Sequence, residues 1–134
     1  MTKLTSIEGI GEKYGEELES AGVSTQEDLL AKGATSAGRK KIAESTGISE
    51  KLVLEWVNQA DLARIKGVGE EYADLLEAAG VDTVPELAQR NADNLLAAME
   101  TTNTEKKLVR QLPTKEQVSD WIDQAKALPR VIEH

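Results

Sequence analysis

A short glycine-containing stretch occurs twice in this sequence, and the repetition constrains the fold more than any other feature. Residues 7–11 read Ile-Glu-Gly-Ile-Gly, and residues 65–69, which lie 58 positions later, read Ile-Lys-Gly-Val-Gly. The same offset relates further pairs along the chain: Tyr14 and Tyr72, Leu18 and Leu76, Val23 and Val81, and Leu29 and Leu87. A fixed offset held over about 23 positions indicates an internal duplication. We therefore predict two similar units, residues 1–64 and residues 65–134.

Apolar residues recur at helical spacing in both units, and Ala, Leu, Glu and Lys, which favour helices, dominate the composition. Thr25, Ser36 and Ser49 each precede such a pattern and are expected to cap helices. We predict an all-α fold in which the two units share one core. The expected helices cover residues 11–21, 26–32, 37–45, 50–64, 70–79, 94–101 and 115–128, with a short lead-in at 3–7 and one more helix capped by Asp82 or Thr83.

The register of the repeat changes within the second unit. Val53 corresponds to Val118 and Trp56 to Trp121, an offset of 65 instead of 58. Seven residues are therefore inserted in the second unit, in the segment 100–112. Both tryptophans lie on apolar stripes of expected helices, so we predict that they are core residues.

Composition excludes several classes of function. The net charge of −8 argues against a broad electrostatic footprint for nucleic acid. There is no Cys and a single His, His134, so thiol catalysis and the usual zinc sites are excluded. The longest apolar run, residues 95–99, is too short to cross a bilayer, and no secretory segment is evident. We expect a soluble, cytoplasmic protein with no enzymatic activity and no cofactor.

The pattern around each glycine turn resembles the helix-hairpin-helix motif. After the second glycine, both turns have a small residue four positions on, Gly15 in the first unit and Ala73 in the second. Residues 75–87 also resemble the C-terminal domain of the bacterial RNA polymerase α subunit. The whole layout, including residues 108–114 and the surroundings of Trp121, resembles a bacterial family of unknown function built from paired helix-hairpin-helix units. The resemblance implies two such units in tandem.

Glycines that flank one apolar residue indicate a tight turn with bare amides that opens directly into a helix. Such a turn can offer its N–H groups and the positive end of the helix to an anion. In helix-hairpin-helix proteins that bind DNA, these amides hold a phosphate without reading sequence. The resemblance implies as donors the amides of Gly9, Gly11, Lys13 and Tyr14, and of Gly67, Gly69, Glu71 and Tyr72. A monovalent cation, which some members bind, would sit at the carbonyls of Thr5, Ile7 and Ile10, or of Ala63, Ile65 and Val68.

The residues after the second glycine depart from the DNA-binding pattern, which usually has a basic residue there. The first unit has Glu12 followed by Lys13, and the second has Glu70 followed by Glu71. Two like unit charges about 4 Å apart cost about 1 kcal/mol in water and about 4 kcal/mol near a protein surface. The first turn, with Lys3 and Lys13 available, is therefore the better candidate for a phosphate site.

Two clusters of basic residues lie outside the turns and could assist phosphate contact: Arg39, Lys40 and Lys41, and Lys106, Lys107 and Arg110. The alternative for each cluster is an ordinary solvated surface, a helix face for the first and a charged loop for the second. Tyr14 and Tyr72 lie one turn into a helix beside the glycines, where a half-exposed ring could contact a base or a partner.

Two hypotheses about function remain open. The first is a non-enzymatic module that contacts nucleic-acid backbone phosphates through the first glycine turn, without sequence specificity. The second is an acidic adaptor that binds a basic protein partner or a sister subunit and does not bind nucleic acid. The resemblance favours the first hypothesis, and the net charge favours the second.

Overall fold

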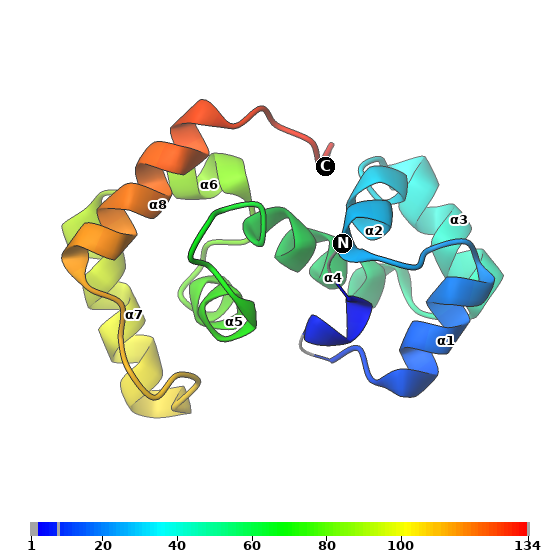
Figure 1. Cartoon of the computed structure of the whole chain (residues 1–134), viewed down its shortest axis with the longest axis horizontal. Coiled ribbons are helices and arrows are strands. Elements are labelled where there is room, and N and C mark those ends of the chain that lie inside the picture. The colour runs from blue at the N-terminus through cyan, green and yellow to red at the C-terminus, as the bar shows by residue number, and fades with distance from the viewer. Residues whose placement is uncertain (1–2, 8, 134) are drawn as a thin grey trace. The chain divides into compact units, whose positions relative to one another are not determined.

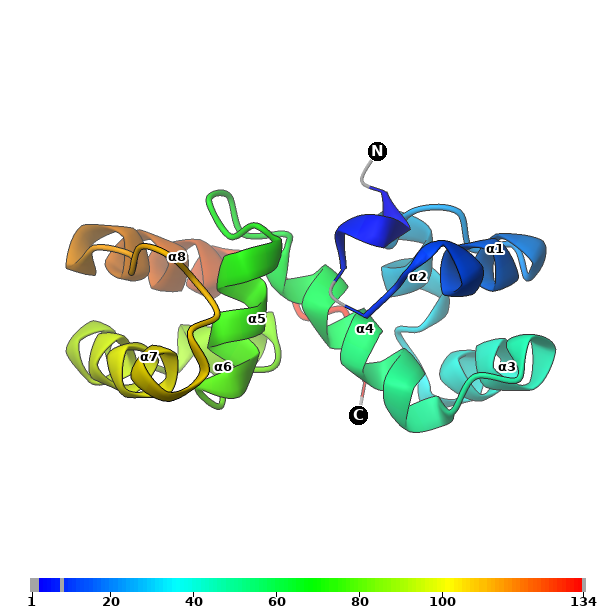
Figure 2. The same cartoon turned by 90° about the horizontal axis from the view of Figure 1, so that it is seen from below.

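The computed structural model describes residues 3–7 and 9–133, apart from the side chain of Glu70. Within these residues the regular structure is helical, which confirms the predicted all-α class, and one isolated bridge pairs Lys3 with Thr25. Figures 1 and 2 show the elements in two views. They are the 3₁₀ helix η1 (Leu4–Ser6) and the α-helices α1 (Glu12–Ser20), α2 (Gln26–Lys32), α3 (Ser36–Thr46), α4 (Glu50–Leu62), α5 (Glu70–Ala78), α6 (Val84–Ala88), α7 (Ala92–Lys106) and α8 (Lys115–Ala127).

The chain divides into two compact units whose limits differ from the predicted ones. Unit 1 comprises residues 1–61 and 131–134, and unit 2 comprises residues 62–130. The repeat pattern had placed residues 131–134 in the second unit. The difference arises because Ile132, which is 2% exposed, is buried in the core of unit 1.

Each unit has a hydrophobic cluster of its own, whereas the sequence predicted one shared core. The repeated apolar positions supply the centre of each cluster, since Leu18, Val23 and Leu29 in unit 1 are fully buried. Their counterparts in unit 2 are buried to the same degree. The remaining members of the unit 1 cluster are Leu4, Ile7, Ile10, Ile42, Ile48, Val53, Trp56, Val57, Ala60 and Ile132.

Unit 2 is formed by α5, α6, α7 and α8. In this unit α8 packs against α6 and α7, and α5 packs against α7. Its cluster includes Leu76, Val81 and Leu87, the counterparts of the three central residues of unit 1, together with Met99 and Trp121. The apolar positions that repeat in the sequence are therefore core positions in both units.

In each unit a tryptophan of the last helix packs against the first glycine of the turn. Trp56 and Trp121 are 1% and 2% exposed, which confirms that both are core residues. Gly9 (φ +93°) and Gly67 (φ +96°) lie in the left-handed region that favours glycine. A Cβ atom at these positions would lie 3.3 Å from Nε1 of Trp56 and 3.0 Å from Nε1 of Trp121, respectively. The backbone conformation therefore favours glycine here, and a Cβ atom would be in tight contact with the indole.

A tyrosine from the first turn of the following helix contacts each indole. The ring centroids of Tyr14 and Trp56 are 5.3 Å apart with an interplanar angle of 57°, and those of Tyr72 and Trp121 are 5.2 Å apart with an angle of 53°. Tilted aromatic pairs at such distances contribute about 0.5–1.5 kcal/mol beyond the burial of their surface. Glycine, indole and phenol thus form one packed group that holds each turn against the last helix of its unit.

The insertion in unit 2 is ordered and folds back onto that unit. It extends α7 as far as Lys106, beyond the predicted end at residue 101, and Lys107 follows in a left-handed conformation (φ 51°). The Asn103 side chain donates to the Val109 carbonyl (3.2 Å) and accepts from the Val109 N–H (3.0 Å). The Tyr72 hydroxyl donates to the carbonyl of Gln111 at 3.2 Å. The insertion therefore covers the tyrosine beside the second glycine turn.

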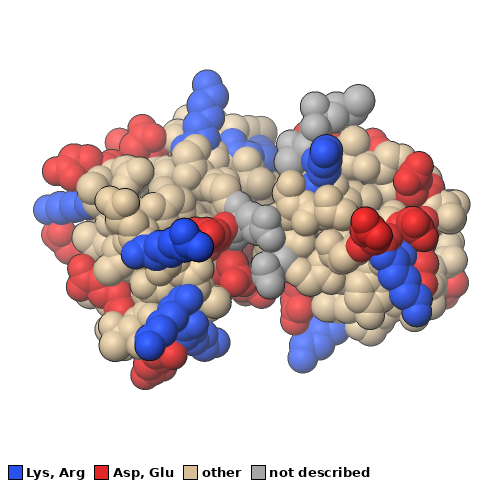
Figure 3. Space-filling model, turned by 60° about the horizontal axis from the view of Figure 1, so that its bottom comes forward, with Lys and Arg blue, Asp and Glu red and all other residues tan. Residues whose placement is uncertain are grey.

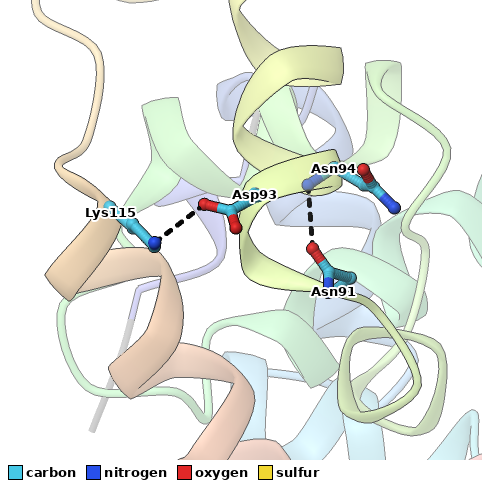
Figure 4. A network of polar contacts seen from close by, with 4 residues as sticks. All are labelled: Asn91, Asp93, Asn94 and Lys115. Carbon is cyan, nitrogen blue, oxygen red and sulfur yellow. Dashed lines mark hydrogen bonds and ion pairs between the residues drawn. The ribbon is translucent and has the colours of Figure 1, made fainter.

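Figure 4 shows the starts of α7 and α8, which are joined at the surface of unit 2. Asn91 caps α7 by accepting from the Asn94 N–H at 3.1 Å. Lys115, at the start of α8, forms an ion pair with Asp93 at 3.0 Å. Both side chains of the pair are mostly exposed, so its contribution to stability is about 0–1 kcal/mol.

Arg39 on α3 is buried and holds main-chain carbonyls of unit 1. Its side chain is 7% exposed, and its guanidinium donates to the carbonyls of Gly33 (2.8 Å), Ala34 (3.2 Å) and Glu133 (2.9 Å). The Glu133 N–H donates in turn to the Ala34 carbonyl at 2.7 Å. Arg39 therefore ties the α2–α3 loop to the segment Val131–Glu133, which its sequence neighbours Lys40 and Lys41 gave no reason to expect.

The first glycine of the turn should be far less tolerant of substitution than the second. We expect Gly9→Ser to lower the free energy of unfolding by at least about 1–2 kcal/mol, because it forces a side chain into the left-handed region. The same change at Gly11, where φ is −87°, should raise it by a few tenths of a kcal/mol, because serine is a better cap. Urea denaturation of the two variants measures the difference, and equal effects would contradict this account of the turn.

Arg39→Met should lower the free energy of unfolding by at least about 2 kcal/mol, because three carbonyls in buried or part-buried hydrogen bonds lose a charged donor. Lys40→Met, which changes the exposed neighbouring residue, is the matched control and should stay within about 0.5 kcal/mol of the wild type. Chemical denaturation followed by far-UV circular dichroism compares them. If the two variants were equally stable, Arg39 would not be a structural residue.

Candidate functional site

Two of the described α-helices begin without a side-chain cap, and both begin at a glycine turn. Gly11 and Gly69 occupy the N-cap positions of α1 and α5, and neither helix has a side-chain cap hydrogen bond. In the other described α-helices a side-chain oxygen accepts from the N–H three residues later. The capping residues are Thr25, Thr35, Ser49, Thr83, Asn91 and Thr114. The first-turn N–H groups of α1 and α5 lack such an acceptor and can donate to a bound anion.

Nothing in the fold requires glycine at the second position of either turn. Gly11 (φ −87°, ψ −175°) and Gly69 (φ −89°, ψ −171°) have extended conformations that any residue adopts. A Cβ atom at either position would have no atom within 4 Å. Serine or threonine could therefore occupy both positions and would cap the helix better. The open space in front of the uncapped N–H groups is suited to the close approach of an external group.

The tyrosine beside the first turn is more exposed than the tyrosine beside the second. Tyr14 is 37% exposed, although its ring packs on Trp56, and Lys13 is exposed beside it. Its counterpart Tyr72 is less exposed and is bonded to the insertion through the Gln111 carbonyl. The tyrosine of the first unit is therefore the less covered of the two.

A glutamine of α8 holds the main chain of the second turn. The Gln124 side chain accepts from the Lys66 N–H at 2.8 Å and donates to the Lys66 carbonyl at 3.0 Å. It also donates to Asp120 at 2.8 Å. The counterpart of Gln124 in the first unit is Gln59, which is 6% exposed. Sequence reasoning missed this glutamine, although its recurrence three residues after each tryptophan was a signal in the repeat.

One side of α1 is strongly acidic. Glu12, Glu16 and Glu19 lie on one helical face and line a cleft of about 370 Å³ in unit 1, together with Lys3 and Thr5. Three carboxylates against one ammonium group make this cleft unfavourable for a phosphate. An anion at the start of α1 would therefore have to approach from the side of Lys13 and Tyr14, away from the cleft.

The basic residues predicted to assist the turns separate into different roles. Arg39 is buried, and its guanidinium is used on main-chain carbonyls, so its predicted place in a nucleic-acid site is corrected to a structural role. Lys40 and Lys41 are exposed on α3, which packs against α1 in unit 1.

The second basic cluster lies in unit 2, the unit that contains the second turn. Lys106, Lys107 and Arg110 are exposed, and Arg110 adjoins Gln111, which bonds Tyr72. Around the second turn itself, Gly67 and Gly69 are exposed, as is Glu71 in the first turn of α5. In the face drawn in Figure 3, lysine and arginine atoms are interspersed with acidic side chains. On this face the basic side chains therefore form no large continuous patch.

Other kinds of site find little support in the described residues. The carbonyls of Ile7 and Ile65 accept from the N–H groups of Ile10 (3.1 Å) and Val68 (3.2 Å), which closes each turn. A cation at the carbonyls of Thr5, Ile7 and Ile10 stays a prediction. No group of three or more His, Asp or Glu side chains in the described part could hold a metal ion. None of the described helices combines the length and the apolar character that a membrane span requires.

The comparison with known protein families gives a match that covers both units of the duplication. A family described as a domain of unknown function (DUF4332) matches residues 8–128. No curated protein and no solved structure matches the chain. Because the family match begins at the first glycine turn and ends just after α8, it spans both units. The chain therefore belongs to this family of unknown function.

Proposed function

We propose that the protein binds nucleic-acid backbone phosphates, without reading base sequence, through the start of α1, and that its units are helix-hairpin-helix units. The observation that carries the proposal is the second glycine of the turn. Gly11 leaves α1 uncapped and leaves space that no side chain of the fold fills. A phosphate oxygen at this place would accept from the N–H groups of the first turn and would interact favourably with the helix dipole.

The first turn is the better site because its tyrosine is more exposed and the residues that follow its second glycine are less acidic. Tyr14 and Lys13 are exposed beside it, whereas Tyr72 is bonded to the insertion. The first turn of α1 carries one glutamate, Glu12, and one lysine, so their charges offset each other. Both residues that follow Gly69 are glutamates, and each would repel a phosphate by about 1–4 kcal/mol at about 4 Å, depending on exposure. The role proposed is binding, and it requires no catalytic group.

A second candidate function is an acidic adaptor that recognises a basic protein segment. The cleft beside α1 favours it, because Glu12, Glu16 and Glu19 line one wall. The net charge of −8 would speed encounter with a positively charged partner. The two functions use different parts of α1, its uncapped start and its acidic face, so they can be separated by substitution.

Changing the second glycine to aspartate should abolish DNA binding by the first turn while leaving the fold intact. We expect Gly11→Asp to raise the free energy of unfolding by a few tenths of a kcal/mol to about 1 kcal/mol, because aspartate caps the helix and complements its dipole. The same carboxylate should reduce binding to a short labelled DNA duplex at least about tenfold, because it occupies the phosphate position. Fluorescence anisotropy at about 50 mM salt measures the binding.

Gly69→Asp is the matched control, since its backbone conformation and open surroundings are the same. It should leave DNA binding within about twofold of the wild type if the first turn is the site. A larger loss for Gly69→Asp than for Gly11→Asp would move the site to unit 2. No retention of duplex or single-stranded DNA by the wild type at about 50 mM salt would reject nucleic-acid binding and leave the adaptor.

The salt dependence of DNA binding should show whether Lys40 and Lys41 on α3 contact phosphates. We expect the combined change Lys40→Glu and Lys41→Glu to lower the slope of log K against log salt by about 1–2 units, one for each phosphate that the lysines no longer neutralise. Lys106→Glu with Lys107→Glu, in unit 2, is the control and should leave the slope unchanged. The opposite result would assign the phosphate contact to the insertion.

A further inference from the structure

The segment Val131–Glu133 occupies a specific seat on unit 1, although unit 2 precedes it in the chain. Ile132 is 2% exposed and is part of the hydrophobic cluster of unit 1. The main chain of Glu133 is bonded on both sides, because its N–H donates to the Ala34 carbonyl at 2.7 Å and its carbonyl accepts from Arg39 at 2.9 Å. One apolar side chain in a socket and two main-chain bonds form a compact recognition site for an extended peptide.

The seat is costly to leave empty. Withdrawal of Ile132 would open a cavity in the core of unit 1, and cores tolerate cavities poorly. Withdrawal of Glu133 would remove one acceptor from the guanidinium of Arg39, which is 7% exposed and has little access to water. The segment that fills this seat must therefore be extended and carry one branched aliphatic side chain. The residue after it must have a main-chain carbonyl and N–H available for hydrogen bonds with unit 1.

We propose that this seat is an exchangeable docking site, which accepts segment 131–133 of a second copy of the chain in place of its own. All the contacts described for the segment are made with unit 1, so they are the same whether the segment comes from the same copy or from another. The connection to unit 2 is short. Pro129 is anchored to unit 2, where its carbonyl accepts from Arg64 at 2.8 Å, and Arg130 alone separates it from Val131. Short connections of this kind favour the exchange of an element between copies.

A synthetic peptide tests whether the seat accepts a segment from outside. The peptide covers residues 128–133 (Leu-Pro-Arg-Val-Ile-Glu), carries a fluorophore at its amino end, and is amidated so that the last carbonyl remains an amide carbonyl. The receptor is the full chain with Ile132→Asp, whose own segment cannot enter the apolar socket. We expect saturable binding to this variant. Binding to the wild type should be at least about tenfold weaker, because the attached segment competes at a high effective concentration.

Two controls define specificity. The same peptide with aspartate in place of isoleucine should not bind, and neither should the peptide bind a chain that carries both Ile132→Asp and Arg39→Met. Far-UV circular dichroism confirms that each receptor is folded. Should Ile132→Asp fail to fold, Ile132→Ala, which keeps a smaller apolar side chain, takes its place as receptor. A folded receptor that does not bind the peptide would overturn the proposal.

Exchange between copies has its own measurement. The wild type, refolded at high protein concentration, should contain a dimer in sedimentation velocity that is absent when Ile132→Asp is refolded in the same way. A wild type that stays monomeric while the peptide binds would overturn the second copy as occupant. A dimer that persists in the Ile132→Asp variant would do the same, because its interface could not be the seat.

Discussion

The contact between an indole and a glycine is the constraint on which the architecture of each unit depends. Trp56 lies so close to Gly9 that a side chain there would be in tight contact with the indole, and Trp121 lies similarly close to Gly67. The left-handed conformation of the glycine turns the chain sharply, so the next helix starts only a few residues later. The turn, the helix that follows it and the last helix of the unit are thereby fixed together, and the uncapped helix start is presented at the surface.

The two units keep this contact and differ in what surrounds it. In unit 2 the insertion reaches back to bond Tyr72. In unit 1 the corresponding tyrosine remains 37% exposed. After a duplication, the tyrosine beside one turn can become covered while its counterpart stays exposed. By this route one copy can keep a binding role while the other becomes chiefly structural.

Local rules predicted much of the fold from the sequence. The all-α class, α2 and the caps Thr25 and Ser49 followed from periodicity and capping chemistry, and burial of the tryptophans followed from the apolar stripes. Thr35 caps α3 in place of the expected Ser36, a difference of one residue that only backbone conformation decides. Contacts between residues far apart in the sequence could not be predicted from such rules. Arg39 reads as one member of a basic run, and its burial depends on carbonyls that include one 94 positions away.

The return of residues 131–133 to unit 1 has a consequence for the order of events during synthesis. A ribosome releases the chain from the amino end, so all of unit 2 emerges before Ile132 can reach its socket. Unit 1 must wait with an incomplete core, whereas the described core of unit 2 contains no residue beyond Leu128. Contacts between residues so distant in sequence also form slowly. The unit that is translated first is therefore the one that matures last.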